Sequence, residues 1–117
     1  MDITGRWSFK EDFGFGLDSG ALTVVDQRGA LSGVLAFTEE VEGDLPFSIQ
    51  LKVEGRRIRR KVWLRAISVI DITSEEEGLE YNLDEWEGTL TSQGQIVGSS
   101  IDSAGVCGVF VLTPEHE

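Results

Sequence analysis

The sharpest chemical feature of this 117-residue sequence is a dense group of basic side chains. Residues 52–65 carry seven Lys and Arg against a single Glu. If residues 57–65 form a strand, alternate side chains point to one side of it and build a cationic stripe beside an indole. Such a stripe is suited to bind an anion, a phosphate, a stacked base or an acidic patch on another molecule. Its members are Arg57, Arg59, Lys61, Trp63 and Arg65.

An acidic block of similar size follows the basic one. Residues 75–87 carry seven Asp and Glu and no basic residue. A hairpin that turns near residues 75–78 would place Glu85 or Glu87 opposite Arg65, and exposed cross-strand ion pairs of this kind contribute about 0.2–1 kcal/mol each. We therefore expect the two blocks to pair within the chain. The alternative is that the stripe contacts another copy or a partner.

Side chains suited to catalysis or metal binding are scarce. The one His, His116, is the penultimate residue, and chain ends are usually loosely held. The one Cys, Cys107, has apolar neighbours, so we expect a buried, unreactive thiol. The carboxylates Glu39, Glu40, Glu42 and Asp44 flank a turn without the spacing of a calcium-binding loop, and we expect them to be solvated. These observations predict no catalytic residues, no metal, no cofactor and no enzymatic activity.

Composition excludes further functional classes. The 21 acidic residues outweigh the 10 basic ones for a net charge of −11, which disfavours binding to nucleic acid. The longest uncharged apolar run, residues 105–112, is too short for a membrane-spanning helix, and no signal peptide is visible. We expect one domain over residues 1–117, located in the cytoplasm, with no membrane and no nucleic-acid partner.

Alternation of apolar and polar residues with period two is the main structural signal, and it is typical of antiparallel sheet. Turn signals that contain Gly separate the alternating runs. Between them the pattern predicts strands at residues 3–10, 21–27, 30–38, 45–54, 57–73, 79–84, 86–93, 95–101 and 105–113. Eight or nine strands on short connections predict an all-β, antiparallel, up-and-down barrel, with a β-sandwich as the alternative.

One stretch, residues 56–70, also fits a helix. Ile58, Val62 and Ala66 recur at helical spacing. The run at residues 67–73 is rich in β-branched side chains, which favour a strand. We prefer the strand, and the helix is kept as the alternative.

Three short motifs carry a resemblance to a known family. They are Ile-Thr-Gly-Arg-Trp at residues 3–7, Gly-Ala-Leu-Ser-Gly at residues 29–33 and Trp-Glu-Gly at residues 86–88. With them the chain resembles the calycin-type barrels, which include avidins and lipocalins, and the resemblance implies a small closed barrel. The biotin site of the avidins is not retained. Phe9 and Phe13 stand where avidins place an amide and a hydroxyl, and Leu35 and Phe37 stand where they place Tyr and Ser.

The inward face of the predicted barrel is apolar and aromatic. An eight-stranded barrel is either filled by such side chains or holds one small ligand, and both alternatives stay open. The first hypothesis is a non-catalytic protein that binds one small apolar or amphipathic ligand, with the 11–20 loop as a lid. The predicted ligand-binding residues are Trp7, Phe9, Phe13, Phe15, Leu35, Phe37, Tyr81 and Trp86. The alternative is an interaction or homo-oligomerisation module that uses the basic strand or the apolar C-terminal strand.

Overall fold

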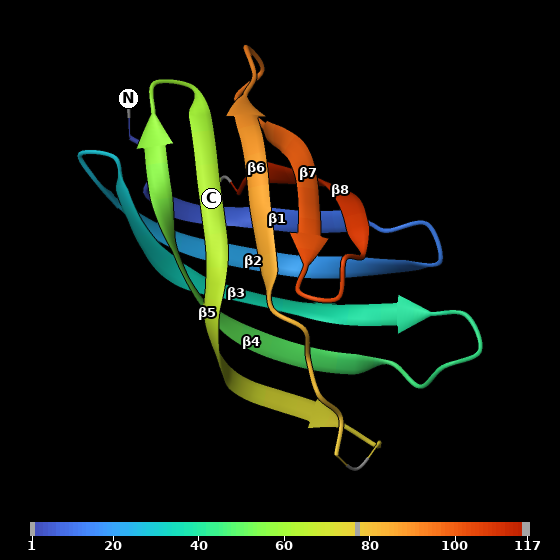
Figure 1. The fold of residues 1–117 in the computed structure, drawn as a ribbon. Coiled ribbons are helices and arrows are strands. Elements are labelled where there is room, and N and C mark those ends of the chain that lie inside the picture. Colours follow the sequence, from blue (N-terminus) through green and yellow to red (C-terminus); the bar gives the residue numbers. More distant parts are fainter. Residues whose placement is uncertain (1, 77, 116–117) are drawn as a thin grey trace.

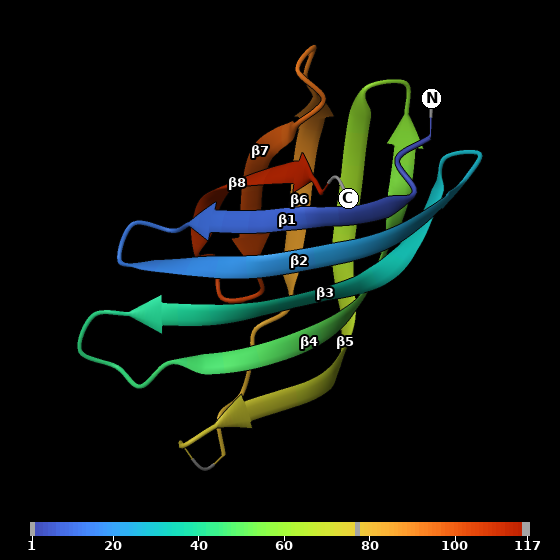
Figure 2. The same ribbon diagram turned by 180° about the vertical axis from the view of Figure 1, so that it is seen from behind.

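The computed structural model describes residues 2–76 and 78–115, so His116 and Glu77 lie outside the described residues. The chain forms one closed antiparallel barrel in which neighbouring strands follow one another in chain order (Figures 1 and 2). The strands are β1 (Gly5–Asp12), β2 (Gly16–Gln27), β3 (Ala30–Val41), β4 (Phe47–Ile58), β5 (Lys61–Ser74), β6 (Asp84–Leu90), β7 (Ile96–Asp102) and β8 (Cys107–Pro114). The predicted all-β, up-and-down barrel is confirmed.

The basic segment is a hairpin, and its prediction as one strand was wrong. Strand β4 continues through Gly55 to Ile58, Ile58 pairs with Lys61, and the chain reverses at Arg59, whose φ is 55°. The sequence pattern predicts this turn at Gly55, between the expected strands at residues 45–54 and 57–73. A side chain at Gly55 would instead clash with the carbonyl oxygen of Trp63, so this glycine permits a close approach of two strands. The helix alternative for residues 56–70 is also excluded.

The predicted strand at residues 79–84 is a connecting segment that reaches the sheet only at Asp84. Its alternating apolar side chains are half-buried, and Tyr81 and Leu83 pack against the core. Strand β5 pairs with β6 only over Lys61–Arg65 and then runs beside β4 alone. The apolar alternation of this segment therefore comes from contact with one end of the barrel, without pairing to a strand.

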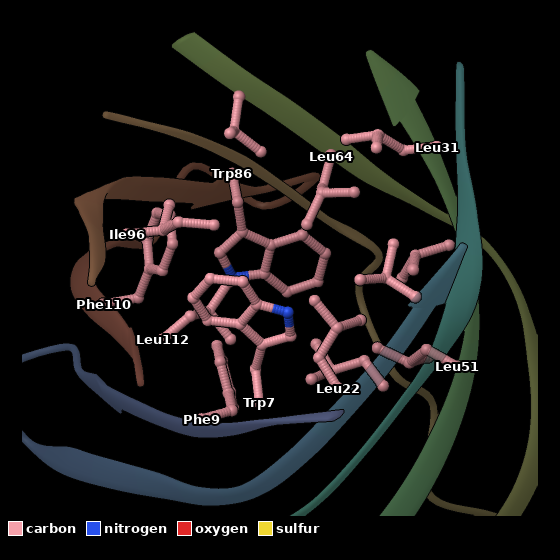
Figure 3. Packing of buried hydrophobic residues seen from close by; sticks show 14 of the residues in the cluster. Trp7, Phe9, Leu22, Leu31, Leu51, Leu64, Trp86, Ile96, Phe110 and Leu112 are labelled. Atoms are coloured by element: carbon pink, nitrogen blue, oxygen red, sulfur yellow. The ribbon is translucent and has the colours of Figure 1, made fainter. Parts of the chain in front are cut away.

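The barrel interior is filled around its two buried Trp side chains. Trp7, Phe9, Leu22, Trp86 and Leu112 converge from different strands (Figure 3), and each exposes less than a tenth of its surface. Phe9 packs edge-on against Trp86 with ring centroids 6.3 Å apart. This part of the interior leaves no space for a ligand, so core packing accounts for most of the inward face.

An ion pair closes the end of the barrel where β2 finishes. Asp26 points inward and accepts hydrogen bonds from the backbone N–H groups of Ile3 and Gly29, at 3.1 and 2.8 Å. It also accepts one from Nε of Arg57 at 2.6 Å. Burial alone would raise the pKa of Asp26, but Arg57 and the two backbone donors outweigh it and hold that pKa below its ordinary value. These three donors therefore offset the cost of removing the Asp26 carboxylate from water.

Candidate functional site

The opposite end of the barrel carries a row of inward carboxyl groups on three neighbouring strands. Glu11 of β1 is the direct register partner of Asp18 of β2, and Asp18 is the partner of Glu39 of β3. Each continues the inward alternation of its strand beyond the apolar core positions. Like charges directly opposite each other destabilise a sheet, so this row costs the fold stability.

A second pair of carboxyl groups faces the same space from the other side of the barrel. Asp84 of β6 and Asp102 of β7 are register partners. We call these five residues, Glu11, Asp18, Glu39, Asp84 and Asp102, the acidic mouth. Two aromatic side chains donate hydrogen bonds into it. Nε1 of Trp86 donates to Glu11 Oε1 across the barrel at 2.8 Å, and the Tyr81 hydroxyl donates to Asp84.

Asp18 is the most deeply buried member of the acidic mouth. It exposes 2% of its surface, and its Oδ1 atom has no hydrogen-bond partner among the described residues. Burial, together with the carboxyl groups of Glu11 and Glu39, raises the pKa of Asp18 to about 10. A buried polar atom without a partner costs about 1–3 kcal/mol, and this oxygen can meet a ligand as an acceptor or, while the carboxyl is protonated, as a donor.

The pKa values of Asp84, Glu39 and the neighbouring Tyr81 are raised as well. Burial raises the pKa of Asp84 to about 7, although the hydrogen bond from Tyr81 opposes the shift. Burial raises the pKa of Glu39, and Glu11 and Asp102 add to that effect. Burial and the neighbouring Asp84 raise the pKa of Tyr81. At neutral pH Asp18 therefore keeps its proton and Asp84 is partly protonated.

A cavity of about 190 Å³ joins the acidic mouth to an aromatic wall. Phe13 and Phe15 come from the β1–β2 loop and stack edge-on with ring centroids 4.8 Å apart. Phe47 at the start of β4 lies 6.2 Å from Tyr81, centroid to centroid. Ser100, Cys107 and short backbone stretches complete the lining. One side of the cavity is therefore polar and rich in acceptors, and the other side is apolar.

The predicted ligand-binding residues divide into two groups. Phe13, Phe15 and Tyr81 line this cavity. Trp86 reaches it through its hydrogen bond to Glu11. The remaining four, Trp7, Phe9, Leu35 and Phe37, are buried core residues that do not line the cavity, although the Phe37 ring packs against Tyr81.

The predicted cationic stripe is divided by the hairpin. Arg57 points inward to Asp26, Arg59 lies in the turn, and Lys61, Trp63 and Arg65 lie on the outward face of β5. We expected the basic block to pair with the acidic block within the chain. The strand register confirms this pairing, because Glu85 lies opposite Arg65. Lys61 Nζ is 3.8 Å from Glu87 Oε1, and both side chains are more than half exposed. These exposed pairs contribute little stability.

Two predictions about single residues were wrong. Cys107 is exposed, because β8 begins there at the barrel end and its side chain lies beside the cavity. Glu39 is half-buried, because β3 extends to Val41 and keeps Glu39 on the inward face. Extending the alternation of Trp7 and Phe9 by one step would have placed Glu11 inward, and the same extension finds the other inward carboxyls. That signal was present in the sequence.

Known proteins add no family assignment. No protein-family model matches the chain, and no curated protein matches it. Across the described residues there is no group of three or more His, Cys, Asp or Glu side chains placed to hold a metal ion. The described part of the chain also contains no helix long and apolar enough to cross a membrane. The fold and the site together define an eight-stranded antiparallel β-barrel with an acidic, aromatic-walled cavity at one end.

Proposed function

We propose that this chain is a non-catalytic binding protein, similar in plan to the calycin-type barrels, that holds one small amphipathic ligand at its acidic mouth. The observation that carries the proposal is the buried Asp18 oxygen without a partner on the wall of a 190 Å³ cavity. A ligand that donates to this oxygen removes the cost of leaving it bare. The binding protein would act in the cytoplasm, where an exposed thiol such as Cys107 stays reduced.

The row of like charges supports a ligand for the same reason. Three neighbouring strands could each carry an apolar residue at Glu11, Asp18 and Glu39, and the barrel would gain stability. Groups that oppose stability cluster at functional sites, where binding compensates their cost. Because core side chains pack at the barrel centre, the proposal assigns the ligand to the end of the barrel, whereas the sequence analysis expected it in the interior.

The aromatic wall supplies the apolar half of the site. Phe15 is 61% exposed although it packs on Phe13, so covering it would bury apolar surface that now faces water. The loop that carries both rings connects β1 to β2 beside Glu11 and Asp18 (Figure 1). An amphipathic molecule would place its apolar part against these rings and its polar part on the carboxyl groups.

Ligand titration followed by amide NMR tests this proposal. Small amphipathic molecules are expected to shift resonances of the β1–β2 loop, Tyr81 and Asp84. The double variant Phe13→Ala with Phe15→Ala should weaken binding about tenfold or more, because it removes the apolar wall. Leu17→Ala is the matched control, since Leu17 is exposed and does not line the cavity. The absence of shifts at this end of the barrel with every molecule would contradict the proposal.

An outer groove supports the alternative, a protein-interaction or homo-oligomerisation module. It has a volume of about 610 Å³ and is lined by Arg56, Trp63, Arg65 and Ile101, among others. Trp63 is 36% exposed and Ile101 is 46% exposed. On the neighbouring β8, Val109 is 62% exposed on the outward face. Exposed aromatic and Arg side chains of this kind are typical of interface centres.

Sedimentation velocity at low and high salt tests the alternative. A complex held by this groove should weaken with salt and disappear in Trp63→Ala with Arg65→Ala. Arg59→Ala is the control, because Arg59 lies in the hairpin turn outside the groove. A chain that sediments as a monomer at every concentration and salt would reject homo-oligomerisation.

A further inference from the structure

We propose that the ligand of the acidic mouth is an organic cation, a protonated amine attached to an aromatic or short aliphatic group. This inference rests on the proposed binding function and names the chemical class of its ligand. It joins three observations from different parts of the site: the donor and acceptor inventory of the cavity, the bare oxygen of Asp18, and the aromatic wall.

Carboxyl groups dominate the polar lining of the cavity, and they can act as acceptors once a cation displaces their protons. The five carboxyl groups of the acidic mouth line it, and none of the described lining residues is Lys or Arg. The two strongest donors are already used inside the protein, since Trp86 donates to Glu11 and Tyr81 donates to Asp84. An anion would meet repulsion and find few donors here. A protonated amine brings three N–H donors and a positive charge, which is what the wall lacks.

Asp18 marks the position of the cationic group. It sits at the centre of the row, with Glu11 on one neighbouring strand and Glu39 on the other. Its Oδ1 therefore lies where carboxyl groups from three strands meet, so one ammonium group that displaces the Asp18 proton would have several carboxyl acceptors around it. The buried Asp26 at the other end of β2 shows the same requirement already met, by the guanidinium of Arg57 at 2.6 Å.

The aromatic wall favours a cation as well. Phe13, Phe15, Phe47 and Tyr81 border the same cavity as the carboxyl groups. Ring faces attract cations by about 0.5–2 kcal/mol. An organic amine uses both walls together, with its charge on the carboxyl groups and its carbon skeleton on the rings. A bare metal ion would use only one, and no group of described side chains is placed to hold one.

Cation binding must compete with protons. The titratable groups that face the cavity are Glu11 of β1, Asp18 of β2, Glu39 of β3, Glu80 and Tyr81 of the connecting segment, Asp84 of β6, Asp102 of β7 and Cys107 of β8. Burial holds protons on Asp18 and, near neutral pH, on part of the Asp84 population. An ammonium group that replaces those protons should bind more tightly as pH rises, and each binding event should release protons.

The test uses three molecules that share one skeleton: 2-phenylethylamine, 2-phenylethanol and phenylacetate. Calorimetry in two buffers of different ionisation enthalpy measures affinity and proton release together. We expect the amine to bind at least about tenfold more tightly than the alcohol, phenylacetate to bind more weakly still, and proton release with the amine alone.

Two variants that each replace one carboxyl group by an amide test whether the amine binds at Asp18. Asp18→Asn keeps the shape of the side chain but cannot ionise, so it should lower amine affinity about tenfold and abolish most of the proton release. Its affinity for 2-phenylethanol should stay within about twofold. Glu40→Gln removes one exposed charge from the adjacent outward position of β3 and should change neither. Circular dichroism checks that both variants are folded.

The outcomes separate this inference from the proposed function. If the alcohol binds as tightly as the amine, the cation is rejected and the binding function stands. If no member of the set binds at millimolar concentration, both are rejected. Equal losses in Asp18→Asn and Glu40→Gln would show a general surface-charge effect and overturn the assignment. Displacement of the amine by equimolar Ca²⁺ would replace the organic cation by a metal ion.

Discussion

Asp18 and Asp26 lie on the inward face of the same strand, and each exposes less than a tenth of its surface. Asp26 has a guanidinium partner and two backbone donors, whereas Asp18 has an oxygen without a partner among the described residues. At both positions, burial makes the ionised carboxylate less stable than it is in water. The difference in compensation gives Asp26 a structural role, underlies the binding role that we propose for Asp18, and sets opposite pH responses at the two positions.

Replacing Asp18 by Asn should stabilise the protein at neutral and alkaline pH. The folded protein holds the Asp18 proton up to about pH 10, while the unfolded chain releases it near the ordinary value of 3.8. Because the folded state binds more protons across this window, stability falls as pH rises through it. Asn cannot ionise, so the variant should gain up to about 6 kcal/mol near pH 8 and nothing below pH 4. Urea unfolding at both pH values measures the gain, and an equal effect at both would refute the explanation.

Replacing Asp26 by Asn should destabilise the protein. The substitution leaves Arg57 largely buried without its counter-ion, which costs about 3–5 kcal/mol. The pKa of Asp26 is lowered in the fold, so its contribution is present above the unfolded value of 3.8 and is lost as pH falls through the folded value. Glu115→Gln is the control, because its ion pair with Arg6 is exposed and contributes less than about 1 kcal/mol. Similar losses in both variants, measured by urea unfolding, would contradict this account.

At the scale of elements, the 14 glycines of the sequence include two kinds with different physical roles. Some glycines lie in turns, such as Gly29 with φ of 92°. Others lie inside strands where two backbones approach closely, as at Gly55 in β4 and Gly98 in β7. The sequence pattern predicted Gly98 inside a strand but took Gly55 for a turn, which is why it ended β4 too early. Only the partner strand shows which kind a given glycine is.

Gly98→Ala should therefore be strongly destabilising. The added Cβ would clash with the backbone carbonyl oxygen of Glu87 on β6, and backbone cannot move aside as a flexible side chain can. We expect a loss of about 3 kcal/mol, at the upper end of overpacking effects. Ser99→Ala, the next residue on the exposed face, should change stability by less than about 0.5 kcal/mol. Thermal unfolding of both variants decides, and a Gly98→Ala variant as stable as its control would disprove the close approach.

At the scale of the whole molecule, the barrel is closed by ladders of unequal length. Strands β2 and β3 pair along their whole length, over Gly16–Gln27. Strands β5 and β6 pair only over Lys61–Arg65, after which the pairing of β5 with β4 becomes irregular. Bulges bend a strand, and here β5 leaves β6 and follows β4 alone. Among the described residues, the β5–β6 ladder is the shortest in the barrel.

Hydrogen exchange should reveal this short ladder. Amides of β6 that bond to β5 are expected to exchange faster than amides at the centre of β2, because local opening of a short ladder costs less free energy. Mass spectrometry of labelled peptides measures both regions in one sample. Raising the salt concentration should leave the order unchanged, since the Lys61–Glu87 pair is exposed and weak. Equal protection of β6 and β2 would show that the barrel opens only as a whole.

Period-two alternation by itself determined most of the strands, their inward faces and the class of fold, but it misassigned residues 79–84 and the hairpin at Arg59. The same pattern contained the inward carboxyl groups, because Glu11, Asp18 and Glu39 continue the alternation of apolar residues on their strands. Only the tertiary structure decided that they are neighbours. Alternation is a local property of one strand, whereas the register that pairs Glu11 with Asp18 and Asp84 with Asp102 depends on strands brought together by folding.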